Sequence, residues 1–506
     1  MTGRLPTETD VVVVGAGTSG CVLAARLAEA GRTVLLLEAG PAEPPPETRD
    51  ATTMRAAVPG SPAAVEVPTE LTPTVSRSVV RGRGAGGSSA VNGCYFVRAT
   101  PADCDGWGVP GWAWAAVLPA FRRLEADREF GGSPLHGADG PIPVTRPAPG
   151  YEPAEAFASA AAALGVPAEP DKNGAGAPGC GPLPSNAVGG LRVSTATAYL
   201  RGQPGPTVRG GVRVARVLVE GGRAVGVVTG AGTVRAGEVV LAAGAVGSPE
   251  LLLRSGIGAA DTLRALGLPV VADVPGVGEG LGDHPMLQVP WRPVPGFPAP
   301  PGLPLQQVLH AAPDGAPGGI EVLPWFRSFA ALLPAWRTAP ADDGVLSLGV
   351  SLLRPQSRGR LTLRSADPEQ PPRLVYGYLS STGDRAGMRA GVRFAADLLR
   401  TAPLAALGVP DGPPGDELSA AVLADDAALD GWIGRHLGTA VHLCGGARMG
   451  PASDTGAVVD GRLRVRGVAG LRVADTSVLP AVPSRGTAAT AVMVGERAAE
   501  LLAAEG

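Results

Sequence analysis

The order of apolar and polar residues over the first forty positions predicts a strand, a helix and a second strand. Val11–Val14 is an uninterrupted apolar run, Cys21–Ala30 is rich in alanine and leucine, and Thr33–Leu37 is a second apolar run. Gly31 stands where a glycine commonly ends a helix. Since neither strand has a polar face, we expect the two strands to be parallel and buried in a βαβ unit.

Later segments carry either the alternation of regular elements or clusters of turn residues. Regular structure is predicted as strands with glycine turns over 209–243, antiparallel strands over 346–365, helices over 384–435, and a strand, loop and terminal helix over 470–506. The stretch 238–258 predicts a strand, a turn and a helix capped by Ser248, with Pro249 in its first turn. Proline- and glycine-rich text predicts a surface excursion over 41–75, loops over 130–190, and long loops forming an access lid over 290–340.

Composition narrows the class of protein. The 506 residues include 74 glycines and 52 prolines, but a hydrophobic content of 45 % and the apolar runs indicate a folded globular protein. The net charge of −3 gives no general attraction to nucleic acid or to an anionic membrane. Lys172 is the single lysine, which excludes a phosphate-binding loop of the G-K-[ST] type.

The cysteines and the first residues bear on the compartment. The five cysteines contain no C-x-x-C pair, which argues against a zinc ribbon or a redox dithiol. The sequence begins without a secretory signal pattern, and no apolar run approaches the roughly 18 residues that a transmembrane helix needs. We therefore expect a soluble cytoplasmic protein without a transmembrane segment.

The glycine turn after the first strand has the G-x-G-x-x-G spacing of a dinucleotide site. Gly15 permits the turn, Gly17 lets a pyrophosphate approach the backbone, and Gly20 lets the helix pack on the strand. The helix N-terminus stabilises the anion, and Glu38 accepts hydrogen bonds from the adenosine ribose. An acid here favours FAD or NAD over NADP. The candidate cofactor-binding residues of this segment are Gly15, Gly17, Thr18, Ser19, Gly20, Glu38 and Ala39.

Five further segments resemble, in order, the glucose–methanol–choline (GMC) family of flavoprotein oxidoreductases. They are GRGAGGSSAVNG (82–93), GAVGSPELLLRSGIG (244–258), LGDHP (281–285), HLCGGARMG (442–450) and DTSVLPAVPS (475–484). The first two are similar to the two signature segments of that family. The resemblance spans nearly the whole chain and implies a bound FAD.

The resemblance also implies an α/β fold (α+β overall) with two lobes. We predict a Rossmann-like FAD-binding lobe and a substrate lobe built on an antiparallel sheet with helices. The predicted boundaries are 1–148, 191–289 and 440–506 for the FAD-binding lobe, 149–190 for a loop-rich segment, and 290–439 for the substrate lobe.

Residue by residue, the resemblance extends the cofactor site. The added candidates are Gly86, Gly87, Ser88, Asn92 and Gly93 in the loop along the flavin, Val214 as a backbone contact to the adenine, and Asp475 near the ribityl-pyrophosphate. Some relatives attach FAD through a histidine in this loop. Val91 occupies that position here, so we expect non-covalent FAD. For Cys94, beside the loop, we expect a packing role.

His442 is similar to the active-site histidine of the family. The resemblance implies that it removes the alcohol proton while hydride moves to flavin N5, and imidazole suits this role near neutral pH. Zinc binding by His442 and Cys444 is disfavoured because no second ligand pair lies nearby, so no metal is expected. His136 and His284 also fall in family motifs, where we expect structural roles, whereas His310 and His436 have no motif context.

One position departs from the family pattern. A second His or Asn usually follows the first histidine by about 43 or 44 residues, and Gly486 stands there in this chain. Loss of such a hydrogen-bond donor typically costs about 3 kcal/mol of transition-state stabilisation. Either Arg485, Thr487 or a group of the substrate takes its place, or the substrate is not a simple alcohol.

Four functions are compatible with these residues. The leading one is an FAD-dependent dehydrogenase for a CH–OH group, and NGCYFVRA (92–99) with HLCGGARMG is most similar to the GMC branch associated with mycofactocin, a peptide-derived redox carrier. That branch implies oxidation of reduced mycofactocin and transfer of its electrons to a respiratory acceptor, with O2 as an alternative acceptor. A carrier with its own polar groups could tolerate Gly486. The alternatives are a general alcohol oxidase or dehydrogenase, a lyase with structural FAD, and a flavin-binding protein without catalysis.

Overall fold

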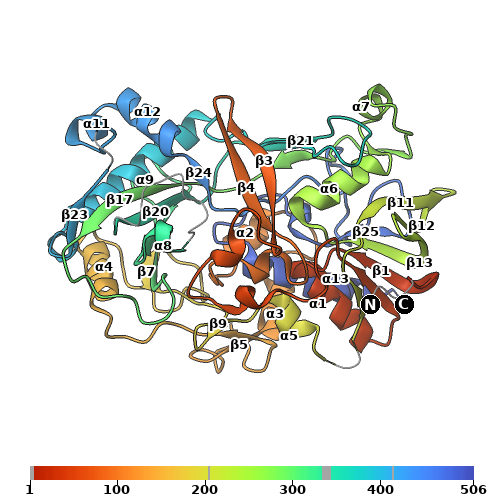
Figure 1. The fold of residues 1–506 in the computed structure, drawn as a ribbon, viewed down its shortest axis with the longest axis horizontal. Helices are drawn as coiled ribbons and strands as arrows, with labels where there is room; N and C mark the ends of the chain where they lie inside the picture. Colours follow the sequence, from red (N-terminus) through yellow and green to blue (C-terminus); the bar gives the residue numbers. More distant parts are fainter. Residues whose placement is uncertain (1–4, 203–204, 333–343, 413–414, 506) are drawn as a thin grey trace.

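The first sheet is built around the buried valine strand near the N-terminus, at the right of Figure 1. The computed structural model describes residues 5–202, 205–332, 344–412 and 415–505. The sheet has the order β10-β2-β1-β13-β12-β11, and β25 also pairs with β13. Its strands are β1 Glu8–Val14, β2 Val34–Leu37, β10 Thr207–Arg209, β11 Val214–Glu220, β12 Arg223–Thr229, β13 Gly232–Leu241 and β25 Leu471–Val473. Strand β1 runs parallel to β2 and β13, as the apolar runs predicted.

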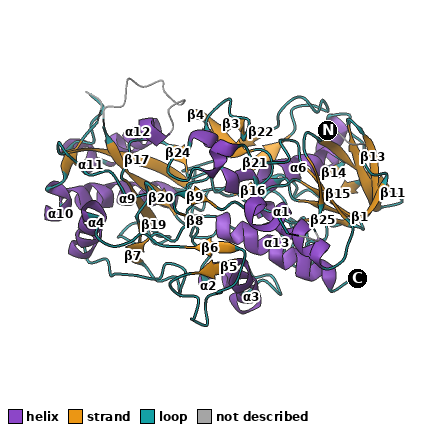
Figure 2. Cartoon of the chain, turned by 60° about the horizontal axis from the view of Figure 1, so that its bottom comes forward, coloured by secondary structure: helices purple, strands orange, loops and turns teal. Residues whose placement is uncertain are grey.

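Helices from both ends of the chain pack together against this sheet. The helices of this lobe are α1 Thr18–Glu29, α3 Trp114–Leu124, α5 Thr195–Tyr199, α6 Gly244–Arg254 and α13 Ala488–Ala503. Figure 2 shows α1 beside α13, where the Ser19 hydroxyl donates to the carbonyl of Ala491 at 2.7 Å. The lobe is therefore assembled from segments that are far apart in sequence.

The predicted start of helix α6 is wrong. The helix begins at Gly244, and Pro249 lies inside it rather than in its first turn. Ser248 does not cap the helix, because its hydroxyl donates to Asp475 at 2.5 Å and accepts from the Ala243 amide at 3.0 Å. A serine before a proline resembles a helix N-cap in sequence, but here the serine hydroxyl is hydrogen-bonded to the carboxylate of Asp475, which is distant in sequence.

The second sheet is antiparallel and fills the other half of the molecule, at the left of Figure 1. It has the order β23-β17-β20-β19-β18-β7, and β24 also pairs with β17. Its strands are β7 Gly179–Pro182, β17 Pro285–Pro293, β18 Gln307–Ala311, β19 Ile320–Trp325, β20 Leu346–Leu352, β23 Gly408–Pro410 and β24 Gly438–Thr439. The helices near it are α4 Glu152–Ala163, α9 Thr382–Arg400, α10 Ala402–Ala405, α11 Ala420–Ala424 and α12 Asp426–His436. The predicted two-lobed α/β architecture with an antiparallel sheet is confirmed.

Two of the predicted loop regions are wrong in part. The region 290–340 holds the end of β17 and all of β18 and β19, while 333–343 lies outside the described residues. Every residue of β19 is buried, so this strand lacks the polar alternation that reveals a strand in sequence, and Pro324 adds a false loop signal. The region 130–190 likewise holds helix α4 and strand β7.

A third sheet, β16-β21-β22-β3-β4, lies between the two lobes. Its strands are β3 Ala64–Thr72, β4 Val75–Gly82, β16 Glu279–Leu281, β21 Gly359–Thr362 and β22 Arg373–Val375. Within the predicted surface excursion over 41–75, residues 64–72 form a long hairpin with β4. This hairpin leads directly into the glycine-rich loop at 82–93.

The remaining elements are short connections. They are η1 Pro46–Arg49, η2 Arg55–Ala57, η3 Gly87–Ala90, α2 Pro101–Gly106, β5 Glu125–Asp127, β6 Ile142–Val144, β8 Ala187–Val188, β9 Leu191–Arg192, β14 Ile257–Gly258, α7 Ala260–Ala265, β15 Ala272–Asp273, α8 Phe329–Leu332 and η5 Thr476–Val478. Across the described ranges, no helix is both long and apolar enough to cross a bilayer.

Candidate active site

The first glycine loop joins β1 to α1 and leaves one side of its backbone open. Gly15 has φ +102°, and a Cβ there would lie 2.6 Å from the carbonyl oxygen of Ala242. A Cβ on Gly20 would lie 1.9 Å from the carbonyl oxygen of Gly15. At Gly17, by contrast, the nearest atom to an added Cβ is 3.7 Å away. The outer two glycines are therefore required by packing, whereas Gly17 faces free space at the N-terminus of α1.

The second glycine loop packs directly on the first. The Gly86 amide donates to the carbonyl of Ala16 at 2.8 Å, and a Cβ on Gly87 would lie 2.7 Å from the Cα of Gly17. The structure thus brings together two glycine segments that are separated by about seventy residues in the sequence, as a shared cofactor site requires. The second loop has no room for a side chain at Gly87, where it packs on Gly17.

Glu38 ties both loops to the end of β2. Its Oε2 accepts from the Ala16 amide at 2.9 Å, and its Oε1 accepts from the amides of Gly40 and Gly84 at 2.7 and 3.0 Å. Its side chain is 8 % exposed. Because each carboxylate oxygen has two lone pairs, Oε2 keeps acceptor capacity for a further donor such as a ribose hydroxyl.

Asp475 lies at the start of α6, on the other side of the sheet end. It accepts from the Gly244 amide at 2.9 Å and from the Ser477 amide at 2.8 Å. Burial raises its pKa, although the hydrogen bonds from Ser248 and Ser477 oppose this shift. Asp475 is therefore a buried acid held by local donors near the glycine loops.

The other predicted cofactor residues lie in the same region with local roles of their own. Asn92 accepts from Arg192 at 2.6 Å, which connects the second loop to β9. Ser88 accepts from the Gly82 amide at 3.2 Å, and Gly93 lies against Leu305 of the substrate lobe. Thr18 and Ser19 begin α1, Ala39 follows Glu38, and Val214 begins β11 as a buried residue.

His442 is held by a second histidine and by a buried carboxylate. Its Nδ1 lies 2.9 Å from Nδ1 of His284, and the two rings are nearly perpendicular at 87°. Its backbone amide donates to Oδ1 of Asp283 at 2.7 Å. The same carboxylate accepts from the His284 amide at 2.8 Å and from the Thr439 hydroxyl at 2.7 Å. His442 therefore has a fixed ring with Nε2 free of these contacts.

Both histidines are neutral near neutral pH. Burial, followed by the positive charge of Arg81, lowers the pKa of His442 to about 4. Burial and the adjoining His442 ring lower the pKa of His284 to about 3. Because a neutral imidazole can accept a proton, the pair is in the protonation state that a general base requires.

Gly486 does lie beside His442, in the partner position that the sequence assigned to it. A Cβ added to Gly486 would lie 3.3 Å from Nε2 of His442 and 2.8 Å from two ring carbons of Tyr95. Arg485, the first suggested replacement, donates instead to the carbonyls of Ser484 and Gly176 at 2.6 and 3.2 Å.

Sequence reasoning missed three polar residues on the far side of this space. They are Tyr95, His310 and Glu321. Tyr95 directly follows the second loop, and its position beside NGC was the one available signal. His310 and Glu321 lie opposite each other on β18 and β19, a pairing that only the sheet register reveals.

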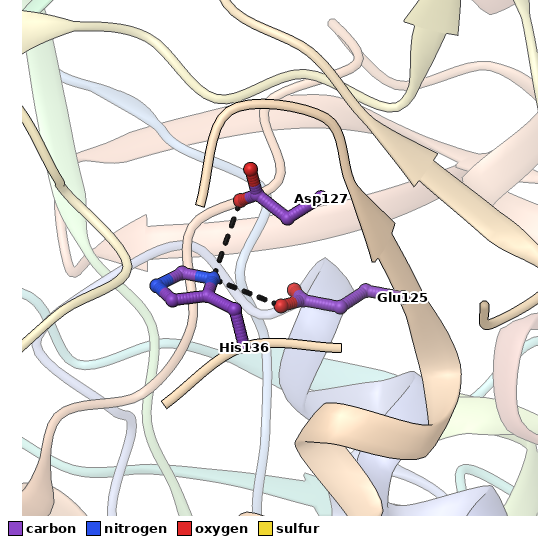
Figure 3. Close-up of side chains that lie close together, drawn as sticks. All are labelled: Glu125, Asp127 and His136. Atoms are coloured by element: carbon purple, nitrogen blue, oxygen red, sulfur yellow. Dashed lines mark hydrogen bonds and ion pairs between the residues drawn. The ribbon is translucent and has the colours of Figure 1, made fainter. Parts of the chain in front are cut away.

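His136 belongs to a separate cluster with Glu125 and Asp127, and the three lie close enough together to hold a metal ion. Figure 3 shows Nδ1 of His136 between the two carboxylates, 3.0 Å from Glu125 and 3.3 Å from Asp127. Arg98 is paired with Glu125, and Arg146 contacts Asp127 at 2.9 Å. Since arginines already balance these acids, the cluster is best described as a buried ion network.

The fold and the site together define a two-lobed oxidoreductase. A dinucleotide-binding lobe meets an antiparallel sheet, and a neutral histidine lies where they join. The chain belongs to the GMC oxidoreductase family, whose two family models match residues 9–286 and 355–495. It is thus an enzyme of a family that acts on CH–OH donors.

Relatives and solved structures cover nearly the whole chain. An uncharacterised GMC-type oxidoreductase of Rhodococcus erythropolis is 41 % identical, over 97 % of this chain and 98 % of its own. An oxygen-dependent choline dehydrogenase of Klebsiella pneumoniae is 34 % identical, over 98 % and 96 %. The crystal structure of pyridoxine 4-oxidase from Mesorbium loti is 30 % identical with a TM-score of 0.87, over 97 % and 98 %. Formate oxidase from Aspergillus oryzae is 26 % identical with a TM-score of 0.89, over 99 % and 98 %.

The ion network predicts a loss of stability at alkaline pH. Burial opposes a charge on His136, but the hydrogen bonds that its ring donates to Asp127, Asp171 and Glu125 outweigh burial and raise its pKa to about 10. A group whose pKa is raised on folding stabilises the protein below its unfolded pKa of about 6.5, and this stabilisation is lost as pH rises toward 10. We therefore expect the melting temperature to decrease as the pH rises from about 6.5 to about 10.

The variant His136→Asn isolates this effect. It should melt lower than the wild type at pH 6.5, by a destabilisation on the order of 3 kcal/mol, because a buried charge loses its partner. The difference should shrink toward pH 10. The matched variant His436→Asn, at a partly exposed histidine paired with Asp416, should follow the wild-type profile. Parallel pH profiles for wild type and His136→Asn would contradict the assignment.

Proposed function

We propose that this protein is an FAD-dependent dehydrogenase that oxidises a CH–OH group, with His442 as the base. The observation that carries the proposal is the position of His442 Nε2. It faces Gly486 at the place where the glycine loops meet the substrate sheet, while Nδ1 is held by His284. FAD, when bound, supplies the acceptor of the substrate hydride.

The residues of the first lobe suit FAD. Gly17 is open at the N-terminus of α1, where no side chain caps the helix, so backbone amides can receive a pyrophosphate. Glu38 retains an acceptor for the ribose. Position 91 is a buried valine with no nucleophile, and burial raises the pKa of the nearby Cys94 thiol, which disfavours its thiolate. These features support a non-covalent cofactor.

The open side of Gly17 gives a test of the cofactor site. The variant Gly17→Ala should fold, because its Cβ meets nothing closer than 3.7 Å and its φ of −76° suits alanine. The Cβ would occupy the approach of the pyrophosphate, so we expect FAD affinity to fall about tenfold or more, a loss of at least 1.4 kcal/mol. Equilibrium titration of the apoprotein with FAD measures this.

The control for this test is Gly132→Ala, at a glycine whose added Cβ also meets nothing within 4 Å. It should bind FAD as the wild type does. Equal FAD affinities for Gly17→Ala and the wild type would remove Gly17 from the site.

The hydrogen bond between the two histidines sets the tautomer of His442. Between two neutral rings, one Nδ1 donates and the other accepts. Nε2 of His284 is buried and has no hydrogen-bond partner among the described residues, so we infer the tautomer from the role proposed for His442, in which Nδ1 of His442 carries the shared proton. His284 Nδ1 then accepts from His442 Nδ1, and His442 Nε2 is left with a lone pair for the substrate proton.

Replacement of His442 tests the base directly. We expect His442→Gln to slow flavin reduction by about 1000-fold, since a positioned general base contributes 10²–10⁴-fold. The acid limb of kcat/KM in the wild type should lie near the pKa of about 4, because protonation of His442 below this pH removes the acceptor. Stopped-flow reduction and a pH series measure both.

The control for the base is His436→Gln, at the end of α12, where the imidazole is paired with Asp416; this variant should leave the rate unchanged. An acid limb near pH 6.5 would contradict the lowered pKa of His442. Full activity of His442→Gln would refute the proposed mechanism.

For the substrate, we propose reduced mycofactocin, with electrons passing to a respiratory acceptor. The support is the likeness of residues 92–99 and 442–450 to the mycofactocin-associated branch, together with the absence of a side chain at Gly486. A donor with its own polar groups does not depend on a second side chain at position 486.

Anaerobic mixing with a panel of donors tests this choice. We expect reduced mycofactocin to bleach the flavin absorbance faster than choline, pyridoxine or benzyl alcohol at equal concentration. Quinone and O2 challenges of the reduced enzyme then identify the acceptor. If another donor bleaches the flavin faster than reduced mycofactocin, that donor takes its place as the proposed substrate. Turnover of a cyanohydrin without bleaching would indicate a lyase.

A further inference from the structure

We propose that Tyr95 supplies the hydrogen bond to the substrate oxygen that a side chain at position 486 would otherwise supply. This inference rests on the proposed oxidation of a CH–OH group by His442. It assigns the role to a residue of the segment after the second glycine loop rather than to the C-terminal segment.

The first argument is the space beside His442. The same point, the Cβ position of Gly486, lies 3.3 Å from His442 Nε2 and 2.8 Å from Cδ1 and Cε1 of Tyr95. A distance of 2.8 Å is shorter than carbon atoms tolerate, so a larger residue at 486 and the tyrosine ring cannot both occupy this space. The Tyr95 ring can therefore occupy this position only because residue 486 is a glycine.

The second argument is that Tyr95 is fixed at the boundary between the lobes. Its ring packs with Leu305 and Trp325 of the substrate lobe, while its backbone follows the glycine loop on the cofactor side. A hydroxyl at this place lies between the strand ends of one lobe and the sheet of the other. Tyr95 and His442 both lie against Gly486, so the tyrosine ring is next to the proposed base.

The third argument is the set of partners of the hydroxyl. It donates to Oε2 of Glu321 at 2.6 Å, and Nε2 of His310 lies 3.4 Å from the hydroxyl and 3.0 Å from the same carboxylate oxygen. Glu321 and His310 are each 2 % exposed. Because these buried groups are paired with one another, they hold the Tyr95 hydroxyl at a fixed position in the substrate lobe.

The protonation states make Tyr95 a donor and not a second base. Burial, followed by the charge of Glu321, raises the pKa of Tyr95 well above 10, so it keeps its proton at working pH. Burial lowers the pKa of His310 and raises that of Glu321. When the Tyr95 hydroxyl turns to the substrate oxygen, His310 Nε2 remains as a partner for Glu321.

The reaction then balances as follows. The O–H proton of the substrate moves to Nε2 of His442, and the C–H bond breaks with its electron pair leaving as hydride to the bound FAD. The substrate oxygen gains negative charge as its proton leaves, and the Tyr95 O–H donates to that oxygen without transferring its own proton. A carbonyl product and a protonated His442 remain.

Removal of the hydroxyl is the direct test. With the best donor of the panel above, Tyr95→Phe should reduce the rate constant of flavin reduction at saturation about 100-fold, with little change in KM, because the donor acts on the transition state. The matched control is Tyr199→Phe, which removes another buried hydroxyl that donates to a carboxylate, Glu496, at 2.8 Å. Its rate should stay within about twofold of the wild type.

An exchange of positions tests whether the two sites are equivalent. Gly486→Asn alone should be slow, because its side chain collides with the Tyr95 ring. The double variant Tyr95→Ala with Gly486→Asn should recover about tenfold or more of the rate lost in Tyr95→Ala, since the amide then donates from position 486. FAD content and melting temperature, measured for each variant, separate this recovery from a gain in folding.

The outcomes are distinct. If flavin reduction in Tyr95→Phe is as fast as in the wild type while His442→Gln is inactive, this inference is overturned and the proposed function is not. Full activity of His442→Gln, or no reduction of the wild type by any donor of the panel, overturns the proposed function and this inference with it. A double variant no faster than Tyr95→Ala overturns the equivalence of positions 95 and 486.

Discussion

The active-site geometry depends on the buried carboxylate of Asp283. It accepts from the backbone amides of His284 and His442 and from the hydroxyl of Thr439, and so joins the start of β17 to the segment that carries the base. Val441, next to the base, has φ +65°, a conformation that is unfavourable for a β-branched residue. The hydrogen bonds that Asp283 accepts from Thr439 and His442, on either side of Val441, hold the chain in this conformation. Together with the pairing of β17 and β24, this carboxylate fixes the imidazole pair relative to the substrate sheet.

Burial has opposite effects at the two main histidine sites. At His442 no carboxylate contacts the ring, so burial and the Arg81 charge keep the imidazole neutral. At His136 three carboxylates contact the ring, and they outweigh burial and keep it charged. The same residue type is therefore neutral in one place, as the proposed base requires, and a structural cation in the other, and the number of nearby acids decides which.

The features that the sequence predicted best are those whose residues lie close together along the chain. The βαβ unit, the glycine turn and Glu38 lie within thirty residues, and local packing dictates each of them. It also placed His442 and Gly486 correctly relative to one another, through a family pattern. It failed where distant partners decide: Ser248 is taken by Asp475 from 227 residues away, and Tyr95 reaches Glu321 across 226 residues. Strand β19, buried on both faces, has no polar alternation that could reveal it.

The position of the proposed donor has a consequence for how the lobes work together. A donor at position 486 would belong to the same C-terminal segment as His442, so base and donor would move as one unit. Tyr95 instead is bound to β18 and β19 through His310 and Glu321. The hydrogen bond to the substrate oxygen is then set by the substrate sheet, while the base is set by Asp283 and His284. Any shift between these two supports changes the distance between donor and base, so catalysis in this chain depends on the fit between its lobes rather than on one segment alone.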